Sequence, residues 1–167
     1  MTNFQLDETD QKILKLLIEN ARMPYLEIAR ECGVSGAAIH QRVKKMENNG
    51  IILGSRLLVD PKALGLNICA FIAVQLKASH YHEVIDVLKK MPEIIECHMI
   101  TGEYTLLLKI YCKRDENLMK LLIDTIQGIP EVTKTETWIS LDQSFNRQIR
   151  IGSITYEPVD IESLRQR

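Results

Sequence analysis

The sequence predicts an α+β protein with a helical N-terminal domain and a C-terminal domain of strands and helices, and three observations support this. Residues 7–49 carry apolar side chains at helical spacing between helix caps and stops. From residue 67 to residue 141, strand-like and helix-like runs follow one another in the order β-α-β-β-α-β. The sequence Met-Pro-Glu-Ile at 91–94 returns as Ile-Pro-Glu-Val 38 residues later. The C-terminal part is therefore expected to consist of two similar halves.

Three helices are expected in the N-terminal domain. Asp7 can cap the first, residues 7–20, whose apolar stripe consists of Ile13, Leu14, Leu17 and Ile18. Pro24 opens the second, residues 25–32, which places Ile28, Ala29 and Cys32 inward and stops at Gly33. The short connection to a third helix is typical of a helix-turn-helix.

The third helix begins after Ser35 and runs to about Asn49, where Gly50 stops it. Ile39, Val43 and Met46 share its inner face. Its outer face is polar and basic, as a helix in the DNA major groove requires, because small or polar side chains can approach base edges while cations meet phosphates. The predicted DNA-binding residues are Ser35, Gly36, Ala37, His40, Gln41, Arg42, Lys44, Lys45 and Arg56. A plain three-helix bundle with a solvated face is the alternative interpretation.

Residues 51–60 are expected to form a strand after the third helix, which favours the winged form of the helix-turn-helix. A hinge is expected at residues 60–65, so the predicted domains are 1–60, for DNA binding, and 61–167, for dimerisation and effector sensing.

The C-terminal domain is predicted to be a ferredoxin-like βαββαβ sandwich, with two helices on one face of an antiparallel sheet. Its strands are expected at 67–76, 94–100, 105–112 and 132–141, and its helices at 80–91 and 116–126. The inward residues of the helices are expected to be Val84, Ile85, Val87, Leu88, Leu118, Leu121, Leu122 and Ile126. Residues 148–155 are a candidate for one more strand.

Apolar side chains on both faces of this sheet predict a dimer. Phe71, Val74, Leu106 and Leu108 belong to strands whose two faces both carry apolar residues, whereas the helices cover only one face. Since burial of apolar surface is worth roughly 25 cal/mol per Å², a second copy packed sheet against sheet is the simplest cover. Two DNA readers in a dimer also suit two half-sites about one helical turn apart.

Composition restricts the other classes of function. The 167 residues are 46% hydrophobic with a net charge of −1, and the basic residues of the third helix form a local patch, which is all that phosphate contact requires. No signal peptide or membrane span is expected, which predicts a cytoplasmic protein. The four cysteines predict buried thiols rather than disulfides. His80, His82, His98 and Cys97 lack ligand-like spacing, and neither a catalytic motif nor a cofactor is expected.

Several of these segments resemble the Lrp/AsnC, or feast/famine, transcription regulators of bacteria and archaea. The resemblance rests on residues 6–14, 20–22, 33–35, 42–43, 47–52 and Gly65, and its order and spacing extend from residue 6 to about 142. It implies a winged helix-turn-helix, a ligand-responsive C-terminal domain, and dimers that assemble further, often into octamers. It also implies an amino-acid effector bound between dimers near the loop that joins the second and third strands.

That loop consists of Thr101, Gly102, Glu103, Tyr104 and Thr105. Gly102 matches the glycine of the family pattern G-x-x-D, whereas Thr105 stands where the family has aspartate. A hydroxyl is a neutral hydrogen-bond acceptor and binds a ligand's ammonium group more weakly than a charged carboxylate does. A different ligand and effector-independent regulation are therefore both alternatives. The resemblance also makes Thr133, Thr135 and Thr137 of the last strand candidate effector contacts, although threonine is first a good strand former.

Two other classes of function are alternatives. Some tetrapyrrole decarboxylases share this two-domain layout, but they need basic and histidine residues that converge on a pocket. An interaction module without DNA binding is the other, and the basic face around Gln41, Lys44 and Lys45 argues against it.

Overall fold

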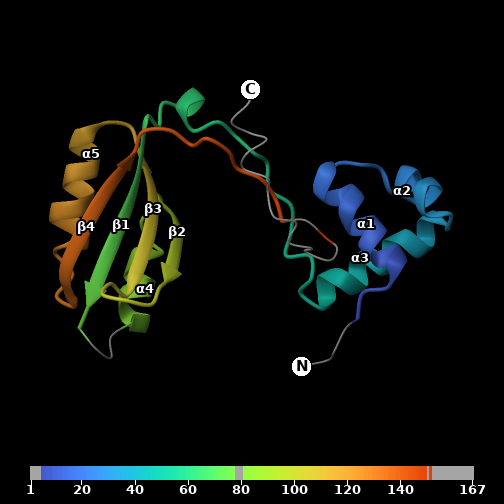
Figure 1. The fold of residues 1–167 in the computed structure, drawn as a ribbon, viewed down its shortest axis with the longest axis horizontal. Helices are drawn as coiled ribbons and strands as arrows, with labels where there is room; N and C mark the ends of the chain where they lie inside the picture. Colours follow the sequence, from blue (N-terminus) through green and yellow to red (C-terminus); the bar gives the residue numbers. More distant parts are fainter. Residues whose placement is uncertain (1–4, 78–80, 150, 152–167) are drawn as a thin grey trace, which may run out of the picture. The chain divides into compact units, whose positions relative to one another are not determined.

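The computed structural model describes residues 5–77, 81–149 and 151. These form two compact units. One runs to Leu57 and also takes in the described residues from Asn146 onward; the other spans Leu58–Phe145. The domain boundary expected at residue 60 lies within three residues of this division, whereas the described residues after Phe145 group with the N-terminal unit. Figure 1 shows the helices of the first unit and the sheet of the second.

The N-terminal unit is built from α1 (Glu8–Glu19), α2 (Tyr25–Cys32) and α3 (Gly36–Asn48), as expected. Asp7 caps α1, and Gly33 adopts φ 67° at the turn between α2 and α3, a left-handed conformation that favours glycine. The core consists of Ile13, Leu14, Ile28, Ala29, Ile39, Val43 and Met46. Leu17, Ile18 and Cys32, predicted to face inward, are only half-buried.

The strand expected after α3 does not form: residues 51–60 carry no strand pairing in the described structure, so this prediction was wrong. Leu53 and Leu58 are 93% and 82% exposed there. A strand exists only when its backbone groups pair with those of a neighbour. The apolar composition of this segment suits a strand, but nothing in the described part of the single chain pairs with it.

The C-terminal unit contains a four-stranded antiparallel sheet of β1 (Ile68–Leu76), β2 (Ile94–Met99), β3 (Leu106–Cys112) and β4 (Val132–Ser140). A 3₁₀ turn, Lys62–Leu64, precedes β1. The strand order is β2-β3-β1-β4, which is the ferredoxin-like arrangement that the doubled βαβ pattern predicted.

Two helical segments cover one face of this sheet (Figure 1). They are α4 (Tyr81–Leu88) and α5 (Asp115–Lys120), and α5 continues as a π-helical segment, Leu121–Ile126. The core between the layers contains Ala70, Ile72, Val74, Val84, Leu88, Leu106, Leu108, Ile110, Leu118, Leu121 and Ile126. Ile85 and Leu122 are half-buried, but Val87 is 40% exposed because it lies on the outer side of α4, so its predicted inward position was wrong.

The other face of the sheet is open, and it is more polar than predicted. The register places Phe71 between Lys109 of β3 and Trp138 of β4 on this face. Val74, Leu106 and Leu108 all belong to the covered core instead. Alternation explains the mixture, since outside the register shifts every second residue of each strand points away from the helices.

Three further expectations concern a strand at 148–155, a membrane span and a metal site. Of the segment 148–155, only residues 148, 149 and 151 are described, and they form no strand; His80 also lies outside the described residues. Within the described ranges no helix is long and apolar enough to cross a membrane. The same ranges contain no cluster of three or more histidine, cysteine or acidic side chains that could hold a metal ion.

Candidate nucleic-acid interface and effector region

The third helix presents two contrasting faces. Ile39 and Met46 are fully buried and Val43 is 4% exposed, so the inner face is fixed against α1 and α2. The Ser35 hydroxyl accepts a hydrogen bond from the Ala38 amide at 3.2 Å, which caps the helix. The outer face is therefore held in a defined orientation by its own buried side.

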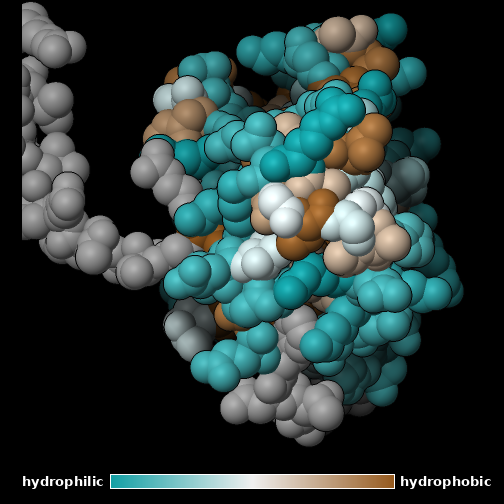
Figure 2. Space-filling view, turned by 90° about the vertical axis from the view of Figure 1, so that its right-hand side faces the viewer, coloured by the Kyte–Doolittle hydropathy of each residue, from teal (hydrophilic) through white to brown (hydrophobic). Residues whose placement is uncertain are grey.

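Most of the predicted DNA-binding residues lie on that outer face. Ala37, His40, Gln41, Lys44 and Lys45 are exposed on α3. Ser35 and Gly36 form the start of the helix. In the view of Figure 2, hydrophilic side chains cover most of the visible surface, with a small apolar group among them. Gln41, Lys44 and Lys45 occupy positions i, i+3 and i+4, which are neighbours on a helix surface.

His40 makes a contact that the sequence did not predict. Its ring lies edge-to-face with that of Tyr25 at the start of α2, with 6.0 Å between the centroids. Aromatic pairs of this geometry are favourable, so Tyr25 restricts where His40 can point.

Arg42 has partners other than the phosphate that the sequence suggested. Its Nη1 atom lies 2.7 Å from Asp7 Oδ2 and 2.7 Å from Asp10 Oδ1, both at the start of α1. The two carboxylates raise the pKa of the Arg42 guanidinium above its ordinary value, through hydrogen bonds to Asp7 first and Asp10 second. This residue therefore joins α3 to α1.

Arg56 lies apart from α3, in the extended segment 51–60, and is exposed. The structure thus brings together the residues of α3 but leaves Arg56 on a separate segment of the chain.

The predicted effector loop between β2 and β3 is tied to β4 by polar side chains. The Tyr104 hydroxyl donates to Glu136 Oε2 at 2.7 Å, and Lys134 Nζ donates to Glu103 Oε1 at 2.7 Å. Lys134 Nζ also lies 5.3 Å from the centre of the Tyr104 ring, close enough for a cation–π interaction. Gly102 adopts φ 116°, which side-chain-bearing residues avoid, so the loop needs glycine here.

The hydrogen bonds of this loop shift two pKa values. The bond to Glu136 raises the pKa of Tyr104, because the neighbouring carboxylate stabilises the protonated phenol. The bonds to Glu103 and then to Tyr104 raise the pKa of Lys134.

Thr105 already has a structural partner. Its Oγ1 accepts a hydrogen bond from the Leu76 amide at 3.3 Å, and its own amide donates to the Val74 carbonyl at 2.9 Å. The side chain is half-buried. Thr105 therefore closes the end of β1, and a ligand would share its hydroxyl with the backbone.

Thr135 and Thr137 lie on the opposite side of β4 from Lys134 and Glu136, whereas Thr133 lies at a register shift in the pairing of β1 with β4. The Thr133 hydroxyl donates to the Gln75 carbonyl at 3.1 Å. Thr135 Oγ1 accepts from Gln127 Nε2 at 2.7 Å, and Thr137 is half-buried. The structure brings Tyr104 and Thr105 to one end of the sheet, but it does not bring Thr135 and Thr137 onto the face of β4 that Tyr104 contacts.

Lys134, Glu136 and Gln127 were missed by the sequence analysis. Tyr104 and Glu136 are 32 residues apart in the chain, and only the strand order makes them neighbours. The alternation of threonine with charged residues along β4 was the available signal, since it separates the two faces of the strand.

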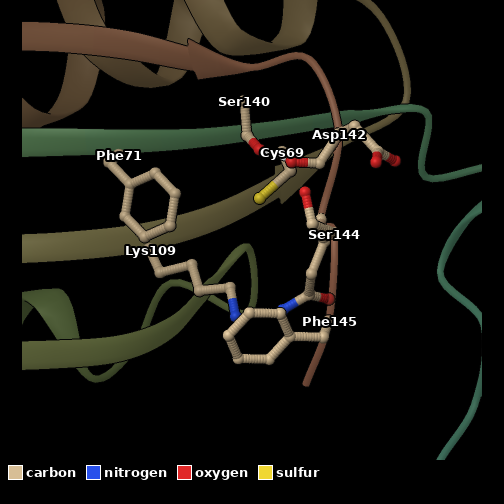
Figure 3. A pocket seen from close by; sticks show the side chains of 8 residues that line it. Cys69, Phe71, Lys109, Ser140, Asp142, Ser144 and Phe145 are labelled. Carbon is tan, nitrogen blue, oxygen red and sulfur yellow. Dashed lines mark hydrogen bonds between the residues drawn. The ribbon is translucent and has the colours of Figure 1, made fainter. Parts of the chain in front are cut away.

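A hollow of about 290 Å³ lies at the other end of the open face (Figure 3). Phe71 and Lys109 line it from the sheet, and the segment that follows β4 contributes Asp142, Ser144 and Phe145. Lys109 is bound to Glu96 at 3.1 Å, and its side chain is 13% exposed. None of the predicted effector residues lines this hollow, because they belong to the end of the sheet where β1 finishes.

Comparisons with known proteins match both units. Residues 6–47 match the AsnC-type helix-turn-helix domain, and residues 69–149 match the Lrp/AsnC ligand binding domain. The regulatory protein AsnC of Haemophilus influenzae is 40% identical over 146 residues, which is 87% of this chain and 97% of that protein. The HTH-type transcriptional regulator FL11 of Pyrococcus horikoshii is 41% identical over 136 residues, 81% of this chain and 89% of that protein.

Solved structures of the same family also match this chain. The structure of Escherichia coli AsnC has a TM-score of 0.82 at 38% identity and covers 88% of this chain and 99% of its own. A transcriptional regulator of Neisseria meningitidis in complex with L-Met has a TM-score of 0.80 at 26% identity, covering 86% and 94%. These matches confirm the helix-turn-helix, the ferredoxin-like domain and the resemblance noted in the sequence. The chain belongs to the Lrp/AsnC family of DNA-binding transcription regulators.

Proposed function

We propose that the outer face of α3 reads double-stranded DNA in the major groove, and that the chain acts in the cytoplasm, where bacterial and archaeal chromosomes lie. Ala37 and Gln41 would meet base edges beside the helix start at Ser35 and Gly36, and His40 would flank them. Lys44, Lys45 and, from its separate segment, Arg56 would meet phosphates. The observation that carries this proposal is the exposed polar face of α3 held over a fully buried Ile39 and Met46.

Selection of duplexes from a random pool tests this assignment. The wild-type protein is expected to enrich a defined site, and Gln41→Ala is expected to relax the preference at one or two positions. A lost bidentate base contact costs about 1–3 kcal/mol of discrimination. A uniform loss of affinity with an unchanged site would remove Gln41 from the base-reading set.

For the C-terminal domain, we propose an amino-acid effector bound near the 101–105 loop. Support comes from the family domain and from the L-Met bound to the Neisseria regulator. Gly102 and the loop amides would approach the ligand, with Thr101, Glu103, Tyr104 and Thr105 around it. Thr133, Thr135 and Thr137 would be reached around β4, which is an edge strand of the sheet. The engagement of Thr105 with Leu76 favours a weaker or altered response compared with a protein that has aspartate there.

Light scattering with and without a panel of free amino acids tests the effector. A change of mass on adding one amino acid would identify it and support a site between dimers. A constant mass over the whole panel would count against an amino acid and direct the search to other small molecules.

Self-assembly is part of the same proposal. We propose a dimer formed by the open sheet faces, which then assembles further, up to an octamer. Phe71 and Trp138 are neighbours on that face, and Trp138 is 46% exposed. A large exposed aromatic on an uncovered sheet favours a partner that covers it.

An enzymatic role is the second candidate, and we propose that the chain has none. A tetrapyrrole decarboxylase of this layout would bind haem or sirohaem in its C-terminal domain. An absorbance titration with haem would show a Soret shift in that case, and an unchanged spectrum would support regulation alone.

A further inference from the structure

Arg42 makes a polar contact between α3 and the start of α1. Its Nη1 atom bridges Asp7 Oδ2 and Asp10 Oδ1, each at 2.7 Å. The Asp10 side chain is 7% exposed and that of Arg42 is 33% exposed, so part of this contact is shielded from water. Partly buried ion pairs whose carboxylates accept several hydrogen bonds hold their side chains in one arrangement better than exposed pairs do.

The two carboxylates are themselves held in place by the cap of α1. Asp7 Oδ1 accepts from the Asp10 amide at 2.7 Å, and Asp10 Oδ2 accepts from the Asp7 amide at 3.3 Å. Each carboxylate thus uses one oxygen for the cap and the other for Arg42. Arg42 therefore contacts a pair of acceptors whose positions the backbone of α1 defines.

This contact lies in the middle of the DNA-reading helix. Arg42 is adjacent to Gln41 in the sequence and lies between the buried Ile39 and Met46 along α3. The buried side chains Ile39, Val43 and Met46 fix which face of α3 points outward. A directional bond from α3 to a fixed acceptor pair further restrains rotation of α3 about its axis.

A second polar bond connects α1 to α2. Lys12 Nζ donates to the carbonyl of Glu31, near the end of α2. Side chains of α1 thus hold the C-terminal end of α2 through Lys12, and the centre of α3 through Asp7 and Asp10.

We propose that Arg42 is a positioning residue for DNA recognition: its bonds to Asp7 and Asp10 fix the exact rotation of α3 within the packed motif, and so the exact positions of the side chains that face the bases. This inference rests on the proposed role of α3 as the DNA reader. It assigns to Arg42 a function different from the phosphate contact that its charge suggested, and it gives Asp7 and Asp10 a part in sequence preference although neither contacts DNA.

The test compares affinities for the duplex selected by the wild-type protein and for a random-sequence duplex of equal length, measured by fluorescence anisotropy over a range of salt. The informative variants are Arg42→Met, which removes the charge and keeps a long stem, and Asp7→Asn, which keeps an N-cap residue and removes one ion pair. Glu8→Gln is the matched control, since it removes an exposed carboxylate from the same helical turn. All measurements are made well below the melting temperature of each variant.

For Arg42→Met and Asp7→Asn we expect the selected duplex to be bound about tenfold more weakly while the random duplex is bound as before, so the specificity ratio falls. The salt slope should stay unchanged, because no phosphate contact is lost. The double variant should lose no more than Arg42→Met alone, because both changes break the same contact. Glu8→Gln should match the wild type.

Several results would overturn the inference. A salt slope reduced by about one in Arg42→Met would assign a phosphate contact to Arg42. Unchanged or tighter binding by Asp7→Asn would show that the bond between Asp7 and Arg42 does not position α3. Losses that add in the double variant, or an unchanged specificity ratio, would also reject positioning. If Gln41→Ala and Lys44→Ala leave DNA binding intact, α3 is not the reader at all, and the proposed function fails instead.

Discussion

Lys44 is the residue whose role is simplest to isolate. It is exposed on the outer face of α3, one turn beyond the positions assigned to base contact. If its ammonium meets a phosphate, Lys44→Ala should weaken binding to all duplexes alike and reduce the slope of log K against log salt by about one. Anisotropy titrations at four or more salt concentrations measure this slope, and an unchanged slope would exclude the phosphate contact.

The contribution of Asp7 to the stability of the folded state should depend on pH. The Asp10 amide first, and the Arg42 guanidinium second, lower the pKa of Asp7 below its ordinary value of 3.8. A carboxyl with a lowered pKa stabilises the folded state above the pKa of the unfolded chain, and this stabilisation disappears as the pH falls through the lowered value. The advantage of wild type over Asp7→Asn should therefore be constant near neutral pH and shrink below about pH 4.

Chemical denaturation of both proteins between pH 7 and pH 3 measures this difference. Fluorescence labelling of the N-terminal unit keeps the signal local to it. A difference in free energy of unfolding that does not change with pH would mean that the Asp7 charge contributes nothing to the folded state.

At the scale of elements, the β2–β3 loop is held by side chains from β4. Tyr104→Phe removes the donor to Glu136 and leaves the ring near Lys134. Hydrogen exchange of amides 101–105 should become roughly two- to fivefold faster, because the loop opens more often, while the amides of β1 and β3 keep their protection. Mass spectrometry of the peptide that contains the loop measures this. Unchanged exchange would show that the Tyr104–Glu136 bond does not hold the loop.

The sequence predicted the elements that carry a clear local signal, the four strands of the sheet among them. The stripe of Ile39, Val43 and Met46 and the cap at Ser35 define α3 without reference to any other part of the chain. Residues 51–60 have the composition of a strand, yet a strand depends on a neighbour that composition cannot reveal. The same limit applies to the π-helical end of α5, since its extra residue per turn leaves no signal in the apolar spacing.

In the candidate sites too, features that depend on local periodicity were predicted and contacts between distant segments were not. The exposed set on α3 followed from periodicity, because a face opposite a buried stripe must point outward. The partners of Arg42, 32 and 35 residues away in the chain, did not follow from it. Charge alone suggested a phosphate contact for Arg42, and only the packing of α1 against α3 reveals the carboxylates that compete for it.

For the whole molecule, the open sheet face decides the state of assembly. Trp138 lies opposite Phe71 on that face and is 46% exposed, so a glutamate there would place a charge in the proposed dimer interface. Because an unpaired buried charge costs several kcal/mol, Trp138→Glu should reduce the mass in light scattering to that of one chain. Ile123→Glu is the matched control, as Ile123 is 53% exposed but belongs to the helical layer. An unchanged mass for Trp138→Glu, or monomers from Ile123→Glu alone, would move the dimer interface away from the sheet.

The same variant tests how assembly affects DNA binding, since a monomer has one reader for one half-site. The monomeric variant should therefore bind the selected duplex far more weakly than the dimer, while a duplex with a single half-site should bind both proteins alike.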